Sequence, residues 1–255
     1  MTLHVEASGS GPDLVLLHGW GTNATIWEEI AAQRTPRFRV HGVDLPGHGA
    51  NPACHPYTLD AVADALAAAL PPRVTVCGWS FGGQVALNWA LRKPGQIERL
   101  VLIATTPRFM RGVQWECGVD IAMLDAFALG LAEDPRTTLQ RFFALQTQDD
   151  ADARTVLRRL RERMFAPGAS DWATLAAELR LLKQTDLRDR LPQVTQPVLI
   201  LHGERDPVVP FAAGAYLQRA LPRAALEMCE GAAHAPFIAQ PQRIARRIAE
   251  FCDGQ

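Results

Sequence analysis

Apolar runs of strand length alternate with helical patterns through the first hundred residues. The runs cover residues 13–17, 38–43, 73–77 and 99–104. Residues 14–17 and 100–103 contain only leucine, valine and isoleucine, which is typical of parallel strands buried on both faces. Residues 58–70 have a helical pattern with Thr58 as N-cap. This alternation predicts an α/β fold with a mostly parallel central sheet and helices on both faces.

The pattern changes between residues 107 and 191, where helical periodicity continues without a convincing strand. Helices are expected over residues 119–131, 137–145, 153–165 and 171–182. Strand patterns resume over residues 197–203 and 225–229, with a helix after Pro210 and a last helix from about Gln240. We therefore expect residues 107–191 to form a helical cap inserted into a core made of residues 1–106 and 192–255.

The most informative motif is Gly78-Trp79-Ser80-Phe81-Gly82, a G-x-S-x-G pattern between a predicted strand and a predicted helix. In this context a sharp strand-to-helix turn exposes the serine hydroxyl, and flanking glycines avoid clashes within the turn. Backbone N–H groups at the start of the helix favour developing negative charge. The motif therefore predicts Ser80 as a nucleophile.

A serine nucleophile needs a base that is oriented by an acid. Asp206 and His234 each follow a predicted strand, in that order along the chain. We expect His234 to accept the proton of Ser80 and Asp206 to orient the imidazole, with Glu204 as the alternative acid. His202, at a strand end, is expected to pack or to form a hydrogen bond.

The segment His18-Gly19-Trp20-Gly21 follows an early strand and resembles the loop that completes an oxyanion hole beside such a serine. We expect the backbone N–H groups of Trp20 and Phe81 to bind the oxyanion. The indole of Trp20 either packs in the core or lines an acyl pocket, and both alternatives remain open.

Composition argues against several other classes of protein. The chain of 255 residues contains 26 Lys and Arg against 27 Asp and Glu, which does not fit a polycationic nucleic-acid-binding protein. The five cysteines form no C-x-x-C pair and the histidines no i, i+4 pair, so we expect no disulfide framework, no metal and no cofactor. No run approaches the roughly 20 apolar residues that span a bilayer, and the N-terminus does not resemble a signal peptide. We expect a cytoplasmic protein.

Over essentially its whole length the chain resembles the α/β-hydrolase family. The resemblance rests on the motif around Ser80, the later Asp206 and His234, and residues 44–49, which are similar to the D-x-P-G-x-G loop of that family. Haloalkane dehalogenases and epoxide hydrolases of this fold use an aspartate nucleophile, so Ser80 argues against both.

A narrower resemblance is to the pimeloyl-acyl-carrier-protein methyl ester esterases of biotin synthesis. It rests on residues 18–21, 78–83, 141–147, 183–188 and 233–237. Phe81 departs from that pattern, in which leucine is expected, and this changes the pocket shape but keeps the N–H donor. The resemblance implies that substrate is contacted by Trp20, Ser80, Phe81, Phe142, Phe143, Ala144, Leu145, Gln146 and His234.

Residues 153–164 carry five arginines against one glutamate. Helical spacing places Arg154, Arg158 and Arg161 on one face beside a stripe of Leu157, Leu160 and Met164. With Arg141, these arginines could dock an acidic acyl carrier protein. The alternative is a solvated helix face balanced by Asp149, Asp150 and Asp152.

Together these features predict a serine carboxylesterase that hydrolyses the methyl ester of pimeloyl-acyl-carrier protein to the free acid and methanol. A broad-specificity short-chain esterase, a lactonase or a carbon–carbon bond hydrolase would use the same residues. A non-catalytic ligand receptor is the remaining alternative, and the complete set Ser80, Asp206 and His234 argues against it.

Overall fold

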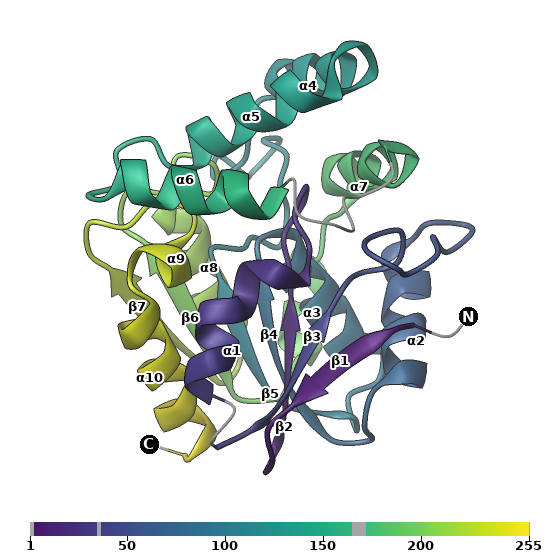
Figure 1. The fold of residues 1–255 in the computed structure, drawn as a ribbon, viewed down its shortest axis with the longest axis vertical. Helices are drawn as coiled ribbons and strands as arrows, with labels where there is room; N and C mark the ends of the chain where they lie inside the picture. The colour runs from purple at the N-terminus through teal and green to yellow at the C-terminus, as the bar shows by residue number, and fades with distance from the viewer. Residues whose placement is uncertain (1–2, 35–36, 165–171, 255) are drawn as a thin grey trace.

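A seven-stranded sheet forms the centre of the computed structural model, which describes residues 3–34, 37–164 and 172–254 (Figure 1). Its strands lie in the order β1-β3-β2-β4-β5-β6-β7, and all neighbours are parallel except β1 and β3. The strands are β1 (Val5–Ser8), β2 (Asp13–Leu17), β3 (Arg39–Val43), β4 (Val74–Trp79), β5 (Ile97–Ile103), β6 (Val198–Gly203) and β7 (Ala224–Cys229).

The strands β2 to β7 confirm the predicted parallel sheet, and each predicted end lies within two residues of the observed one. β4 continues to Trp79 because Gly78 and Trp79 still pair with β5, and this carries the strand up to Ser80. β1 was not predicted, since only Val5 of its four residues is even half-buried. Its pairing with β3 at the edge of the sheet makes it a strand.

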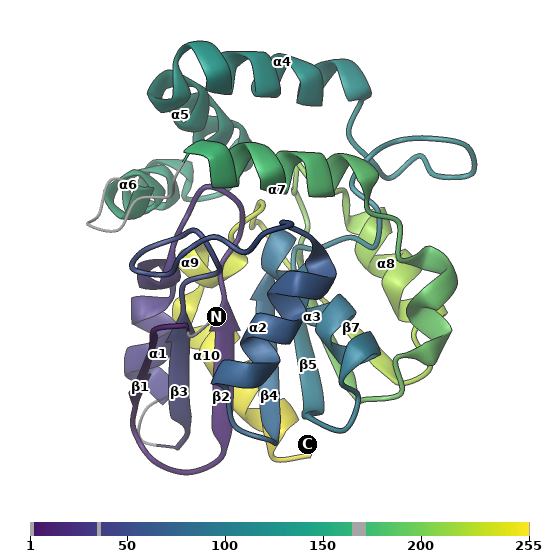
Figure 2. The ribbon, with the colours of Figure 1, turned by 90° about the vertical axis from the view of Figure 1, so that its right-hand side faces the viewer.

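Helices cover both faces of the sheet. α1 (Glu28–Arg34) and α10 (Pro241–Cys252) lie on one face, and α2 (Leu59–Ala69), α3 (Phe81–Arg92) and α8 (Phe211–Ala220) lie on the other (Figures 1 and 2). The hydroxyl of Thr58 accepts a hydrogen bond from the N–H of Ala61, as expected of the N-cap of α2. The remaining short helices are η1 (Ala24–Trp27), η2 (Arg188–Gln193) and α9 (Pro236–Ala239).

The core is formed by the strands and the apolar faces of these helices. The side chains of Leu14, Leu16 and Leu17 are completely buried, as are those of Trp79 and Trp89. Burying one large apolar side chain contributes about 1.5–3 kcal/mol. The unbroken apolar runs of the sequence therefore correspond to strands covered on both faces.

Four helices form a layer beyond the carboxyl ends of the strands (Figure 2), and we call it the helical layer. It comprises α4 (Ile121–Glu133), α5 (Pro135–Gln146), α6 (Ala153–Met164) and α7 (Trp172–Gln184). The helices predicted here are all present, although two of the predicted end residues, Phe165 and Asp171, lie outside the described residues. None of the described helices, here or elsewhere, is long and apolar enough to cross a membrane.

The two segments that join the helical layer to the sheet are held together by charge. Nη1 of Arg108, on the entering segment, lies 2.9 Å from Oδ2 of Asp186 on the returning segment. Arg188 also binds this carboxylate, with Nη2 2.7 Å from Oδ2, and the N–H of Leu187 donates to the carbonyl of Pro107. Asp186, Leu187 and Arg188, which belong to the segment 183–188 singled out in the sequence, thus tie the two connecting segments together.

A buried ion pair fastens α7 to the core. Nε2 of His48, in the loop after β3, lies 2.8 Å from Oε1 of Glu178 on α7, and both side chains are completely buried. Nδ1 of His48 donates to the carbonyl of Thr22, and the hydroxyl of Tyr57 lies 2.9 Å from the same Glu178 oxygen. Burial lowers the pKa of His48, but the charge and hydrogen bond of Glu178 outweigh it and the pKa is raised. His48 is therefore protonated at mildly acidic pH.

We expect Glu178→Gln to lower the free energy of unfolding by about 3 kcal/mol at pH 6, because it removes the carboxylate charge that pairs with the buried His48. Since the pKa of His48 is raised in the folded state, the pair's contribution is full below about pH 6.5 and is lost as pH rises through the folded-state pKa. Urea unfolding between pH 5.5 and 9 measures this. Glu162→Gln, at an exposed position, is the control, and a Glu178→Gln effect that does not change with pH would contradict the assignment.

Candidate active site

Ser80 occupies a strained turn between β4 and α3. Its backbone angles are φ 53° and ψ −116°, a region that non-glycine residues rarely adopt and that costs about 1–3 kcal/mol. A Cβ atom on Gly78 would overlap the carbonyl of Gly82, and one on Gly82 would clash with the carbonyl oxygens of Leu17 and His18. The flanking glycines are therefore required by the close approach of neighbouring backbone.

Hydrogen bonds to the backbone of Ser80 hold this turn. The hydroxyl of Thr105 donates to the carbonyl oxygen of Ser80 at 2.6 Å, and the N–H of Gly83 donates to the same oxygen at 3.0 Å. The N–H of Ser80 donates to the carbonyl of Ile103 at the end of β5. Thr105 is completely buried. It lies 25 residues after Ser80 in the chain, outside the motif, so the sequence did not predict its role.

The structure brings Ser80, His234 and Asp206 into one hydrogen-bonded chain. Nε2 of His234 lies 3.0 Å from Oγ of Ser80, and Nδ1 of His234 lies 2.8 Å from Oδ2 of Asp206. Because Nδ1–H donates to the carboxylate, the lone pair of Nε2 faces the serine hydroxyl. The three residues follow β4, β7 and β6, whose carboxyl ends share one edge of the sheet.

Asp206 is oriented by its own loop. Oδ1 accepts hydrogen bonds from the N–H groups of Val208 at 2.9 Å and Val209 at 2.8 Å, while Oδ2 faces His234. The alternative acid, Glu204, instead accepts from the N–H of Gly231. The geometry thus brings Asp206, and not Glu204, to the imidazole.

His202 supports the same loop. Its Nε2–H donates to the carbonyl of Val209 at 2.8 Å, and the ring is completely buried. Burial lowers the pKa of His202, so the ring remains neutral and Nδ1 has no hydrogen-bond partner among the described residues. This is the packing and hydrogen-bonding position expected from the sequence.

The backbone N–H groups of Trp20 and Phe81 have no hydrogen-bond acceptor within the described part of the chain. Phe81 is the first residue of α3, where a helix leaves N–H groups without intrahelical partners. The Trp20 loop is fixed by the N–H and hydroxyl of Thr22, which both donate to the carbonyl of Gly19. A further bond runs from the N–H of Leu45 to Nε2 of His18. Both groups are available to bind an oxyanion.

A narrow apolar cavity of about 30 Å³ lies between the sheet and the helical layer. The residues that line it include Trp20, Phe127, Phe142, Leu145, Leu179 and Val208. The rings of Trp20 and Phe142 meet edge to face, 4.9 Å apart, while Nε1 of Trp20 donates to the carbonyl of Leu175. The indole therefore packs against Phe142 and also lines this cavity.

The other residues named from the resemblance have different positions on α5. Phe143 is completely buried and faces the loop of Gly21, and Ala144 is exposed. Neither lines the cavity, because successive residues of a helix point about 100° apart. Gln146 is 1% exposed and its Oε1 has no partner among the described residues, so it is a buried polar group available near His234, whose N–H donates to the Gln146 carbonyl.

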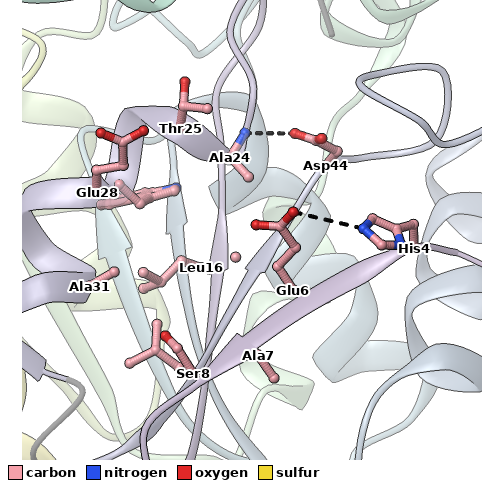
Figure 3. A pocket seen from close by; sticks show the side chains of 13 residues that line it. His4, Glu6, Ala7, Ser8, Leu16, Ala24, Thr25, Glu28, Ala31 and Asp44 are labelled. Atoms are coloured by element: carbon pink, nitrogen blue, oxygen red, sulfur yellow. Dashed lines mark hydrogen bonds and ion pairs between the residues drawn. The ribbon is translucent and has the colours of Figure 1, made fainter. Parts of the chain in front are cut away.

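A second hollow, of about 580 Å³, lies at the β1 edge of the sheet (Figure 3). Its walls include Glu6, Glu28 and Asp44 around an apolar floor that contains Leu16. Oδ1 of Asp44 already accepts from the N–H of Ala24 at 2.7 Å. None of Ser80, Asp206 and His234 lines this hollow, so its size does not mark it as the reactive site.

No group of three or more His, Cys, Asp or Glu in residues 3–34, 37–164 and 172–254 is arranged to hold a metal ion.

The arginine side chains of α6 divide between two directions. Arg154, Arg158 and Arg161 are exposed, as is Arg141 on α5, whereas Arg159 lies 2.9 Å from Glu29 of the core. Leu160 is completely buried and Leu157 is half-buried, while the side chain of Met164 lies outside the described residues. Of the acids weighed against the arginines, Asp150 is itself buried, so it is not part of a solvated face.

Comparisons with known proteins point to one family. The model of the alpha/beta hydrolase family matches residues 14–247. Proteins named pimeloyl-[acyl-carrier protein] methyl ester esterase are 43% identical in Nitrosomonas europaea, covering 95% of this chain and 96% of the relative, and 41% identical in Chromobacterium violaceum, covering all of both. Among solved structures, a hydrolase from Pseudomonas aeruginosa has 27% identity and a TM-score of 0.80 over 97% of this chain and 93% of its own. An esterase from Exiguobacterium antarcticum, at 24% identity, shares the fold with a TM-score of 0.89 over 98% and 94%.

We expect Thr105→Val, which removes the hydroxyl that holds the Ser80 turn, to lower kcat for p-nitrophenyl acetate about five- to tenfold. This corresponds to the loss of one hydrogen bond of about 1 kcal/mol. Thr105→Ser keeps the hydroxyl and is expected to retain most of the rate. Steady-state kinetics of the two variants check this, and equal losses in both would contradict a specific role of the hydroxyl.

Proposed function

Because this chain belongs to the alpha/beta hydrolase family, we propose that it is a serine carboxylesterase that hydrolyses the methyl ester of pimeloyl-acyl-carrier protein in biotin synthesis. The observation that carries the chemistry is the hydrogen-bonded chain from Ser80 through His234 to Asp206. The substrate is supported by full-length relatives that carry the name of this esterase at 41–43% identity.

The reaction proceeds in two halves. Oγ of Ser80 attacks the ester carbonyl while Nε2 of His234 accepts its proton, and Asp206 stabilises the resulting imidazolium. The N–H groups of Trp20 and Phe81 bind the oxyanion of the tetrahedral intermediate. His234 then protonates the departing methoxy oxygen, which leaves as methanol. Water activated by His234 hydrolyses the acyl-Ser80 ester, releasing the free carboxylate and regenerating the serine, with no cofactor or metal.

The enzyme selects the distal methyl ester over the thioester by the position of each bond relative to Ser80. The polymethylene chain lies in the apolar cavity lined by Trp20, Phe142 and Leu145, and each buried CH₂ contributes about 0.8 kcal/mol. Gln146 is the nearby polar contact. Residues 107–191 act as the cap over a core of residues 1–106 and 192–255, so the thioester and its carrier stay outside. A cavity of about 30 Å³ holds about one water molecule, so side chains of the cap must rearrange to admit the chain.

The carrier docks on the exposed arginines of the cap. Arg154 and Arg161 form no ion pair with an acidic side chain in the described part of the chain, and Arg158 lies 4.0 Å from Glu162 at the exposed surface. Such arginines can bind the carboxylates of an acidic carrier in bidentate fashion.

The five cysteines are all unpaired, which supports a reducing, cytoplasmic location.

The test compares kcat/KM for pimeloyl-acyl-carrier-protein methyl ester with that for free dimethyl pimelate. We expect a preference of about 10-fold or more for the carrier-bound ester, from electrostatic steering. The double variant Arg154→Glu/Arg158→Glu should remove most of this preference at low salt and change the rate with dimethyl pimelate less than twofold, because the charges act on encounter.

Arg219→Glu is the matched control, since Arg219 is an exposed arginine on α8. Equal turnover of both substrates by the wild-type protein would instead indicate a broad-specificity esterase. Equal losses on both substrates in the double variant would contradict docking on α6.

A further inference from the structure

The loop between α5 and α6 is bound directly to the loop that carries His234. We call residues 146–151 the α5–α6 loop and residues 231–234 the histidine loop. The N–H of His234 donates to the carbonyl of Gln146 at 3.2 Å, and the N–H of Ala151 donates to the carbonyl of Gly231 at 2.8 Å. Between these two bonds, the N–H of Ala233 donates to Oδ2 of Asp150 at 2.8 Å. Three contacts thus join the cap to the histidine loop.

Asp150 uses both carboxylate oxygens on backbone N–H groups. Oδ1 accepts from the N–H of Asp152 at 2.8 Å while Oδ2 accepts from Ala233, and the residue is 8% exposed. No cationic side chain in the described ranges forms an ion pair with it. A buried carboxylate without a counter-ion is costly unless it is hydrogen-bonded, and charge-assisted bonds to N–H groups are stronger than neutral ones. Its place between the two loops is therefore a specific arrangement.

The opposite side of His234 is held by the strand that presents the nucleophile. Nε1–H of Trp79 donates to the carbonyl oxygen of His234 at 2.8 Å, and Trp79 immediately precedes Ser80. The backbone of His234 is thus fixed between β4 on one side and the α5–α6 loop on the other. The 3.0 Å separation of Nε2 and Oγ depends on both sides, and an error of about 1 Å in such a position can cost about 100-fold in rate.

We infer that Asp150 is a positioning residue for His234, through which the cap sets the geometry of the base. The inference rests on the proposed function, since it assumes that His234 acts on Ser80. Asp150 also binds the N–H of Asp152 just before α6, so the helix that carries Arg154 and Arg158 is joined to the base by a short hydrogen-bonded path. Displacement of the cap breaks the contacts that hold His234.

The test is Asp150→Asn, which keeps the shape of the side chain but places an NH₂ group against one of the two backbone donors. With dimethyl pimelate, a substrate that needs no carrier, we expect kcat to fall about 10- to 100-fold with KM changed less than twofold. Rates are divided by the concentration of Ser80 that a fluorophosphonate labels at completion. Loss of folded protein therefore does not lower the kcat that is obtained. A merely structural residue would lower the titratable fraction and leave kcat unchanged.

Asp152→Asn removes the same charge two residues along at an exposed position and is expected to have wild-type kcat. Asp150→Glu keeps both carboxylate oxygens and is expected to retain more kcat than Asp150→Asn, which provides a second variant if the first does not fold. Wild-type kcat in Asp150→Asn, or equal losses in the Asn and Glu variants, would overturn the inference. Failure of the wild-type protein to hydrolyse the diester would instead overturn the proposed function.

Discussion

The strained backbone of Ser80 is the constraint on which the rest of the site depends. A φ of 53° allows β4 to pass directly into α3. The hydroxyl is left at the edge of the sheet, beside the N–H of Phe81, which has no acceptor among the described residues. The turn exists only because glycines at 78 and 82 permit close backbone contacts and because Thr105 binds the carbonyl of Ser80. The backbone directly after the neighbouring strand β5 is also strained, since Ala104 has a φ of 46°. The cost of these conformations is offset by the buried hydrogen bonds that surround the turn.

The helical layer is part of this arrangement and not a separate cover. Glu178 of α7 forms a buried ion pair with His48, which in turn binds the carbonyl of Thr22 in the loop after Trp20. Asp150, at the other end of the layer, binds the histidine loop. The helical layer therefore contacts both the loop of Thr22, beside Trp20, and the loop that carries His234. For the carrier-bound substrate that we propose, these contacts connect the exposed arginines of α6 to His234.

The sequence predicted what local patterns encode. The parallel strands and the helices of the cap follow from apolar periodicity, and Ser80 follows from its place between a strand and a helix. Long-range pairings could not be predicted, because no local pattern relates Asp150 to Ala233 or His48 to Glu178, which lie 83 and 130 residues apart in the chain. The sequence placed Asp150 among the acids of a solvated helix face, whereas in the structure Asp150 is buried and binds the N–H of Ala233. The sequence favoured Asp206 over Glu204, and the loop after β6 adds the geometry: Asp206 accepts from two N–H groups and faces His234, whereas Glu204 accepts from Gly231.

The most direct test of the account is the release of methanol from pimeloyl-acyl-carrier-protein methyl ester by the wild-type protein and by Ser80→Ala. We expect the variant to fold normally and to lose at least about 10⁴-fold in kcat, because no other group forms the acyl intermediate. Turnover by Ser80→Ala within about tenfold of the wild-type rate would contradict a serine mechanism at this site.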